Sequence, residues 1–167
     1  RQREWRPRPL PLAPALSNED LPEVVAQLLN VRGIGSRLEL ESFLNPLPHE
    51  PSLLPDMDEA TQRLRTAIDA GETIGIFGDF DVDGVSGSAV VAQGLGELGA
   101  KIIPYIPHRM SEGHGLNEPA ILALKEQGVS VLVTVDCGVT AFREVFLAQE
   151  LGMDVIITDH HLPTHTP

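Results

Sequence analysis

The sequence predicts an α/β fold, namely a parallel doubly wound sheet preceded by a small helical N-terminal cap. From residue 56 onward the chain repeats one order of features: an amphipathic helical stretch, a glycine, and a short run rich in β-branched residues. These runs are almost continuously apolar, as expected for parallel strands covered by helices on both faces. The predicted strands are Thr73 to Phe77, Lys101 to Ile106, Ser130 to Val135 and Asp154 to Thr158.

The first third of the chain has a different composition. Residues 1–16 are rich in Arg and Pro, which predicts either a basic, extended arm or a disordered tail. Residues 17–55 are expected to form the small helical cap and its connection. Ser17 or Asn18 can cap the first helix of this segment, and the second helix ends before Pro46.

Residues 56–167 are expected to form the α/β domain. A glycine follows each predicted helix of this domain, in the position where a left-handed backbone conformation closes a helix. These glycines are Gly71, Gly99, Gly128 and Gly152.

The charge balance and the cysteine content of the chain argue against some classes of protein. The formal net charge is −12, and the chain has only 12 Lys and Arg residues, which argues against a simple DNA-coating module. An acidic balance is compatible with an enzyme whose carboxylates surround cations. Cys137 is the only cysteine, so no internal disulfide can form, and no apolar run approaches about eighteen residues. We therefore expect a soluble, intracellular protein.

Polar side chains gather directly after the predicted strands. In a doubly wound sheet the ligand site lies beyond the carboxyl ends of the strands. Packing alone does not explain why so many acids and histidines follow four successive strands. The residues concerned are Asp79, Asp81, Asp83, His108, Arg109, Asp136, Asp159, His160 and His161.

Carboxylates gathered this closely would repel one another unless cations lay among them, so we expect divalent metal ions. A ligand set of mostly carboxylates with imidazole suits Mn²⁺ or Mg²⁺ better than a thiolate-rich zinc site does. Two ions about 3.5–4 Å apart can share one carboxylate and stabilise both the entering and the leaving oxygen at phosphorus. Cys137 could join as a soft ligand, although a small packed residue is the simpler interpretation.

Two simpler interpretations apply to the first acidic run. Asp-rich turns after strands often cap the next helix, and Asp83 or Ser86 could do so for a helix from Val85 to Leu98. The Asp79-x-Asp81-x-Asp83-Gly84 run also resembles the start of an EF-hand loop. The EF-hand interpretation fails because Val90 stands where that loop needs Glu and because a strand precedes the run.

A more serious alternative is an aspartyl-nucleophile phosphatase. The segment from Phe80 to Val85 resembles the motif of haloacid-dehalogenase-type phosphatases, in which Asp81 would attack phosphorus and Asp83 would act as acid and base with one Mg²⁺. That family also needs a later lysine and a late acidic pair. The last predicted strand is followed instead by Asp159-His160-His161.

Asp159-His160-His161 is similar to the motif that names the DHH phosphoesterase superfamily, and Asp81-Val82-Asp83-Gly84 and Asp136 precede it in the order which that superfamily requires. Many small-substrate members have a His where Phe77 stands here. Several further segments resemble the RecJ-type exonucleases within the superfamily. These are Gly78 to Gly84, Tyr105 to Arg109, Glu112 to Asn117, Arg32-Gly-Ile and Phe43 to Pro46.

The resemblance implies 5′ to 3′ removal of nucleotides from single-stranded DNA in recombination and repair, by Mn²⁺- or Mg²⁺-dependent hydrolysis. It implies that Asp136 bridges two metal ions, and that Asp79 is a further ligand or an outer base. The other implied metal ligands are Asp81, Asp83 and His160.

The resemblance also implies contacts with the substrate. His161 would touch the scissile phosphate or assist the leaving oxygen, with Asp159 orienting the histidine pair. His108 and Arg109 are placed to hold a terminal or scissile phosphate, Arg109 through its forked guanidinium. Ser86 and Asn117 are further candidates for phosphate contacts.

The expected cofactors are two divalent cations, with no nucleotide cofactor. The expected partners are single-stranded DNA, a single-strand-binding protein and a helicase, in the bacterial cytoplasm and without a membrane. RecJ-type proteins carry one more metal-binding Asp and further domains after the His-His pair, so we expect the metal site formed by these residues to be incomplete. A third alternative is a non-catalytic DHH-fold module in a repair complex, which an eroded acid cluster would support; the cluster here is intact.

Overall fold

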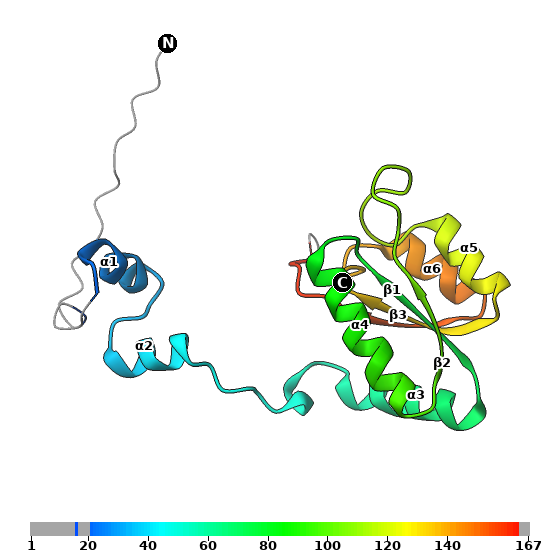
Figure 1. The fold of residues 1–167 in the computed structure, drawn as a ribbon, viewed down its shortest axis with the longest axis horizontal. Coiled ribbons are helices and arrows are strands. Elements are labelled where there is room, and N and C mark those ends of the chain that lie inside the picture. Colours follow the sequence, from blue (N-terminus) through cyan, green and yellow to red (C-terminus); the bar gives the residue numbers. More distant parts are fainter. Residues whose placement is uncertain (1–15, 17–20, 164–167) are drawn as a thin grey trace, which may run out of the picture. The chain divides into compact units, whose positions relative to one another are not determined.

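The computed structural model describes residue 16 and residues 21–163. The described residues fall into two compact units, which divide between Leu53 and Leu54 (Figure 1). The predicted basic arm lies outside the described residues, apart from Leu16. Ser17 and Asn18, predicted as helix caps, also lie outside them. No helix in the described ranges is long and apolar enough to cross a membrane.

The N-terminal unit contains two short helices, α1 (Glu23–Val31) and α2 (Arg37–Leu44), and a 3₁₀ turn at Pro51–Leu53. Helix α1 begins with Pro22 in the N-cap position. Helix α2 begins with a capping box, in which Ser36 Oγ accepts a hydrogen bond from Glu39 N–H and the Glu39 carboxylate accepts one from Ser36 N–H. A small core holds the unit together and consists of Leu16, Ala26, Leu29 and Leu40.

The C-terminal unit is a four-stranded parallel sheet with the strand order β2-β1-β3-β4. Its strands are β1 (Thr73–Gly78), β2 (Lys101–Tyr105), β3 (Val129–Val135) and β4 (Asp154–Thr158). Its helices are α3 (Met57–Ala70), α4 (Val82–Glu97), α5 (Glu118–Glu126) and α6 (Phe142–Glu150). The predicted parallel α/β sheet preceded by helices is confirmed, and the four predicted helix-closing glycines all have positive φ, between 67° and 88°.

Helices cover both faces of the sheet. Helices α3 and α4 pack on one face, where Ile74 and Ile76 of β1 are fully buried, and α5 and α6 pack on the other, against Phe77 and Leu132. Burial of each such side chain contributes about 1.5–3 kcal/mol to folding. Strand β1 is central because its residues are apolar toward both faces.

This topology decides where a ligand can bind. The chain adds β2 on one side of β1 and then crosses to add β3 and β4 on the other side. The direction of winding therefore reverses between β1 and β3, and the crevice beyond their carboxyl ends is the usual ligand position in such sheets. Asp79 follows β1 and Asp136 follows β3, so both residues stand at this crevice.

Candidate active site

The turn after β1 places three carboxylates next to the start of α4. Asp79 is buried, with 7% of its surface exposed, and Asp81 is the N-cap of α4. Asp81 Oδ1 accepts hydrogen bonds from the backbone N–H groups of Gly84, at 3.1 Å, and Asp83, at 3.0 Å, and these bonds lower the pKa of Asp81. The prediction of Asp83 or Ser86 as the cap was wrong, because α4 begins at Val82, three residues earlier than Val85.

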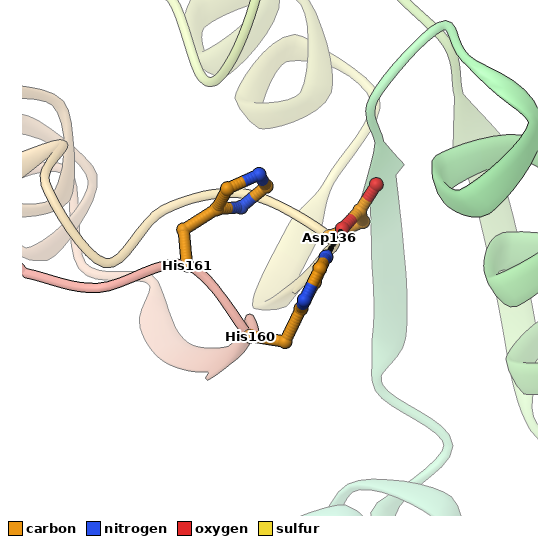
Figure 2. A group of neighbouring side chains, drawn as sticks. All are labelled: Asp136, His160 and His161. Carbon is orange, nitrogen blue, oxygen red and sulfur yellow. Dashed lines mark ion pairs between the residues drawn. The ribbon is translucent and has the colours of Figure 1, made fainter. Parts of the chain in front are cut away.

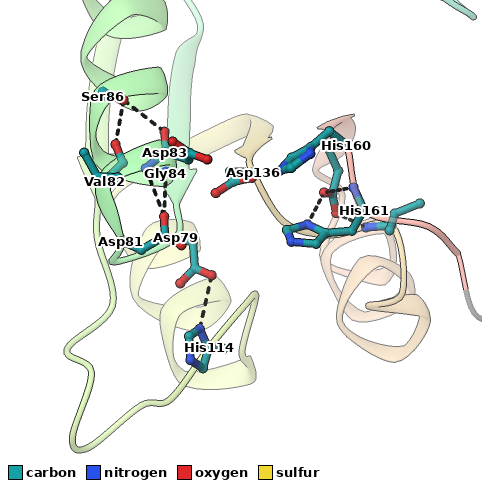
Figure 3. Close-up of polar contacts among 12 residues, drawn as sticks. Asp79, Asp81, Val82, Asp83, Gly84, Ser86, His114, Asp136, His160 and His161 are labelled. Carbon is teal, nitrogen blue, oxygen red and sulfur yellow. Dashed lines mark hydrogen bonds and ion pairs between the residues drawn. The ribbon is translucent and has the colours of Figure 1, made fainter. Parts of the chain in front are cut away.

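Gly84 allows α4 to approach the end of β1. A Cβ atom at this position would lie within 2.5 Å of Asp79 N, so only glycine lets the first turn of the helix pack against the Asp79 backbone. This close approach brings Asp79, Asp81 and Asp83 to one corner of the sheet (Figure 3).

Asp136 follows β3 in a left-handed conformation with φ of 61°, which is uncommon for a residue other than glycine. Its N–H donates to Thr158 O at 2.8 Å, which fixes the turn against β4. The side chain is 8% exposed. Burial and then the neighbouring charge of Asp81 raise the pKa of Asp136.

One oxygen of Asp136 stands out. The buried Oδ1 lies 3.0 Å from His160 Nε2, yet it accepts no hydrogen bond. A buried carboxylate oxygen without a hydrogen-bond donor costs free energy unless another positive group satisfies it. His160 and His161 reach toward this oxygen from the segment after β4 (Figure 2).

Asp159 fixes the second histidine. Asp159 Oδ1 accepts from His161 N–H at 3.0 Å and lies 2.7 Å from His161 Nδ1, and Oδ2 accepts from Val139 N–H at 3.0 Å. Partial burial alone would raise the pKa of Asp159, but these hydrogen bonds outweigh it and lower that pKa. The same contact raises the pKa of His161. The imidazole is therefore held by Nδ1, which leaves Nε2 for a ligand.

The donor set fits a divalent cation. One ligand atom from each of Asp136, His160 and His161 lies within 4.8 Å of the others. Asp81 is close enough for its charge to affect Asp136. Carboxylate and imidazole donors around an unsatisfied buried oxygen suit Mn²⁺ or Mg²⁺, and the contact between Asp159 and His161 fixes the orientation of His161 beside them.

His114 belongs to the site, although it is absent from the predicted site residues. Its Nδ1 lies 3.3 Å from Asp79 Oδ2, and its ring centroid lies 4.2 Å from that of Phe80. It comes from the loop between β2 and α5, which has no regular pattern. The segment from Glu112 to Asn117 carries a family similarity, but nothing in its spacing indicates that the loop reaches Asp79.

The other predicted residues take up positions around this centre. The Arg109 guanidinium carbon lies 5.2 Å from the Phe80 ring centroid, and His108 Nδ1 lies 3.0 Å from Ser111 Oγ. Ser86 Oγ donates to Val82 O within α4. Asn117 is the N-cap of α5 and accepts from Ala120 N–H at 3.0 Å. The predicted phosphate contacts of these residues stay predictions.

Two hollows adjoin at the carboxyl end of the sheet. One has a volume of about 480 Å³ and lies between His114 and Asp79 on one side and Gly138 to Ala141 and His161 on the other. The second, about 630 Å³, lies between α4 and the ends of β3 and β4, beside His160. Asp136 and Asp159 line both hollows. Cys137 is buried in the core, and burial raises the pKa of its thiol to about 12, as expected for a packed thiol.

Comparisons with known proteins show what this chain is similar to. The family model described as "DHH family, N-terminal domain" matches residues 73–167. The single-stranded-DNA-specific exonuclease RecJ of Bacillus subtilis is 43% identical over 84% of this chain and 18% of its own length, and that of Thermus thermophilus is 38% identical over 81% and 20%. The chain thus spans about a fifth of the length of these curated relatives.

The fold comparison gives the same family. A crystal structure of exonuclease RecJ bound to manganese is 38% identical, with a TM-score of 0.66, and the match covers 72% of this chain and 31% of that one. The structure of RecJ from Thermus thermophilus in complex with Mn²⁺ matches with a TM-score of 0.63 and 30% identity, over 92% of this chain and 21% of that one.

Proposed function

Because the chain belongs to the DHH family, we propose that it provides the metal-binding part of an exonuclease that hydrolyses phosphodiester bonds of single-stranded DNA. The observation that carries this proposal is the buried Asp136 Oδ1, which accepts no hydrogen bond at the centre of a carboxylate and histidine cluster. The similarity to single-stranded-DNA-specific exonucleases supports the substrate class. The manganese-bound structures of similar proteins support the choice of cation.

In this proposal, Asp136 and Asp81 hold divalent cations together with Asp83, His160 and, as a further ligand or an outer base, Asp79. Bound cations would supply positive charge that stabilises the oxygens around phosphorus during displacement. The lowered pKa of Asp81 keeps it ionised and ready to bind a cation. The raised pKa of Asp136 reflects a burial cost that a bound cation would remove.

The chain's own residues would then orient the substrate. Asp159 holds His161 by Nδ1 and favours its protonated form, so that Nε2–H can donate to the scissile phosphate or to the leaving oxygen. Arg109, exposed on the loop after β2, would hold a phosphate through its guanidinium. The formal charge of −12 means that most of the attraction for DNA must come from such local groups or from other parts of the protein.

The same proposal includes a single-strand-binding protein and a helicase as partners and the bacterial cytoplasm as the compartment. These parts rest on the similarity to RecJ-type exonucleases alone. The family match favours it over the aspartyl-nucleophile alternative. Asp81, the nucleophile of that alternative, instead caps α4 through Oδ1.

The test uses the longest polypeptide that contains this chain. Calorimetric titration with Mn²⁺ should give two bound ions, and Asp136→Asn should abolish binding of both while Asp154→Asn, at the other end of β4, should not. The parent protein should release mononucleotides from labelled single-stranded DNA, and Asp136→Asn should not. A single bound ion whose affinity does not change when Asp136 or His160 is replaced would support the aspartyl-nucleophile alternative. Binding of DNA without hydrolysis would support a non-catalytic module.

A further inference from the structure

An exposed ring beside the metal-binding cluster has no role in the mechanism above. The His114 side chain is 70% exposed, and its ring packs on the half-buried ring of Phe80, with centroids 4.2 Å apart and planes inclined by 41°. His114 and Asp79 line the 480 Å³ hollow together with Asp136 and His161 (Figure 3). A ring that is exposed yet stacked on a second ring at such a position needs an explanation, because packing alone would bury it.

The ring of His114 is held in place although it is exposed. Asp79 Oδ2 lies 3.3 Å from Nδ1, and the flanking Gly113 and Gly115 both have positive φ, 79° and 76°, a conformation that glycine adopts without strain. Farther along the loop, Glu112 accepts hydrogen bonds from Tyr105 Oη at 2.6 Å and from His108 N–H at 2.7 Å. Fixing a contact group before binding reduces the entropy lost on binding.

A positive group completes the cluster. The Arg109 guanidinium carbon lies 5.2 Å from the Phe80 ring centroid, within the range of a cation–π contact. Flat rings next to a cation are the combination that binds single-stranded nucleic acid, since bases stack on the rings and phosphates pair with the cation. A duplex would not present its base faces to such a surface.

We infer that the His114 ring, backed by Phe80, forms a stacking platform for one unpaired base of the strand, with Arg109 at the adjoining phosphate. This inference rests on the proposed function and deepens it, because it assigns the recognition of single-strandedness to residues of this chain. Of the three residues, His114 lines the 480 Å³ hollow, whose volume lies within the range of about 300–1,000 Å³ that is usual for small-molecule sites and can hold one nucleotide. His114 is thereby a substrate-contacting residue.

Two variants separate stacking from the contact with Asp79. His114→Phe keeps a ring on Phe80 and removes the nitrogen near Asp79, whereas His114→Asn keeps a polar group and removes the ring. In the longest polypeptide containing this chain, His114→Asn should raise KM for single-stranded DNA about tenfold, with kcat changed by less than about twofold, because the ring on which the base stacks is lost. His114→Phe should restore KM to within about threefold of the parent.

The substrate provides the matching change. The oligonucleotides carry a single abasic position, placed first, second or third from the attacked end. At one of these three positions the missing base should lower the affinity for the parent. The same substrate should not lower the affinity for His114→Asn any further. Met110→Ala, in the same loop at an 86% exposed position, should behave as the parent with every substrate.

Equilibrium binding without metal, followed by fluorescence anisotropy, keeps the two proposals distinguishable. Equal affinities of the parent and His114→Asn, or a loss that His114→Phe shares, would overturn the stacking platform while leaving hydrolysis intact. If the parent binds but does not hydrolyse DNA, the proposed function fails, and the anisotropy difference between His114→Asn and His114→Phe still decides the platform.

Discussion

His161 Nδ1 lies 2.7 Å from Asp159 Oδ1, and the two residues are separated by one residue in the chain. The adjacent His160 turns instead toward Asp136, with Nε2 3.0 Å from Oδ1. Two consecutive histidines thus serve different carboxylates. Asp159 also accepts from Val139 N–H, so it connects His161 to the turn after β3.

Asp159→Asn should lower kcat for DNA hydrolysis about 10- to 100-fold, because loss of the carboxylate behind an imidazole disturbs its orientation and basicity. The hydrogen bond to Val139 N–H can persist through the Asn oxygen, so the fold should survive. Steady-state kinetics of the parent and the variant give this ratio. Asp154→Asn is the control, since Asp154 begins β4, the strand that Asp159 follows, and pairs with Arg63 at the opposite end of the sheet. Equal losses of kcat in both variants would contradict a specific role of Asp159.

Asp136→Asn should stabilise the metal-free protein by about 1 kcal/mol at pH 7 while reducing the rise in Tm that Mn²⁺ produces. The folded-state pKa of Asp136 is raised, so its ionised form destabilises the fold above that pKa, and Asn removes this cost. Asn also tolerates the left-handed backbone at φ of 61°. Thermal melts with and without Mn²⁺ measure both effects.

Asp56→Asn is the matched control for this experiment. Asp56 is the other described residue besides glycine with positive φ, at 55°, and its side chain is exposed. The same chemical change there should leave both the metal-free Tm and the Mn²⁺ response unchanged. A lower metal-free Tm for Asp136→Asn would show that burial of the Asp136 carboxylate and its repulsion by Asp81 do not destabilise the folded protein.

Gly84→Ala should destabilise the C-terminal unit by about 2–3 kcal/mol, because the added Cβ would meet the Asp79 backbone at the start of α4. Gly94→Ala in the same helix has nothing within 4 Å of the added Cβ and should stabilise by about 0.5–1 kcal/mol. Urea denaturation measures both changes. Similar values for the two variants would rule out the close packing of α4 on Asp79.

Glu72→Gln should lower the free energy of unfolding by roughly 1 kcal/mol at pH 7 and have little effect below the lowered folded-state pKa of Glu72. The pKa of Glu72 is lowered by hydrogen bonds from Arg63, with N–O distances of 2.7 and 3.3 Å, and from Ser130 at 2.6 Å. A lowered folded-state pKa contributes stability above the unfolded pKa and loses it as pH falls through the folded pKa. Unfolding measured at a series of pH values, from above the unfolded pKa to below the folded-state pKa, tests this, with the exposed Glu59→Gln as control.

Tyr105 offers a spectroscopic test of the loop that carries His114. Its hydrogen bond to Glu112 raises the pKa of Tyr105 to about 12. Because the chain has a single Tyr, ultraviolet titration of this chain reports on that residue alone. Glu112→Gln should bring the pKa back toward about 10. A parent value near the ordinary one would mean that Glu112 does not hold the loop in solution.

The sequence alone determined the fold class and the main members of the candidate site. Apolar strands separated by amphipathic helices and glycines leave few alternatives to a parallel sheet, because each such strand must be buried on both faces. Residues that follow parallel strands must then share one edge, which is why Asp81, Asp136 and His160 could be grouped without coordinates.

Only the tertiary structure decided how individual atoms are used. The first helical residue of α4 depends on a hydrogen bond of Asp81, and the use of Asn117 as the cap of α5 depends on the fold of the loop before it. The contact of His114 with Asp79 joins residues 35 positions apart through an irregular loop. Side-chain periodicity carries information about faces of helices and strands, whereas such loop contacts arise from packing between elements and leave no pattern in the sequence.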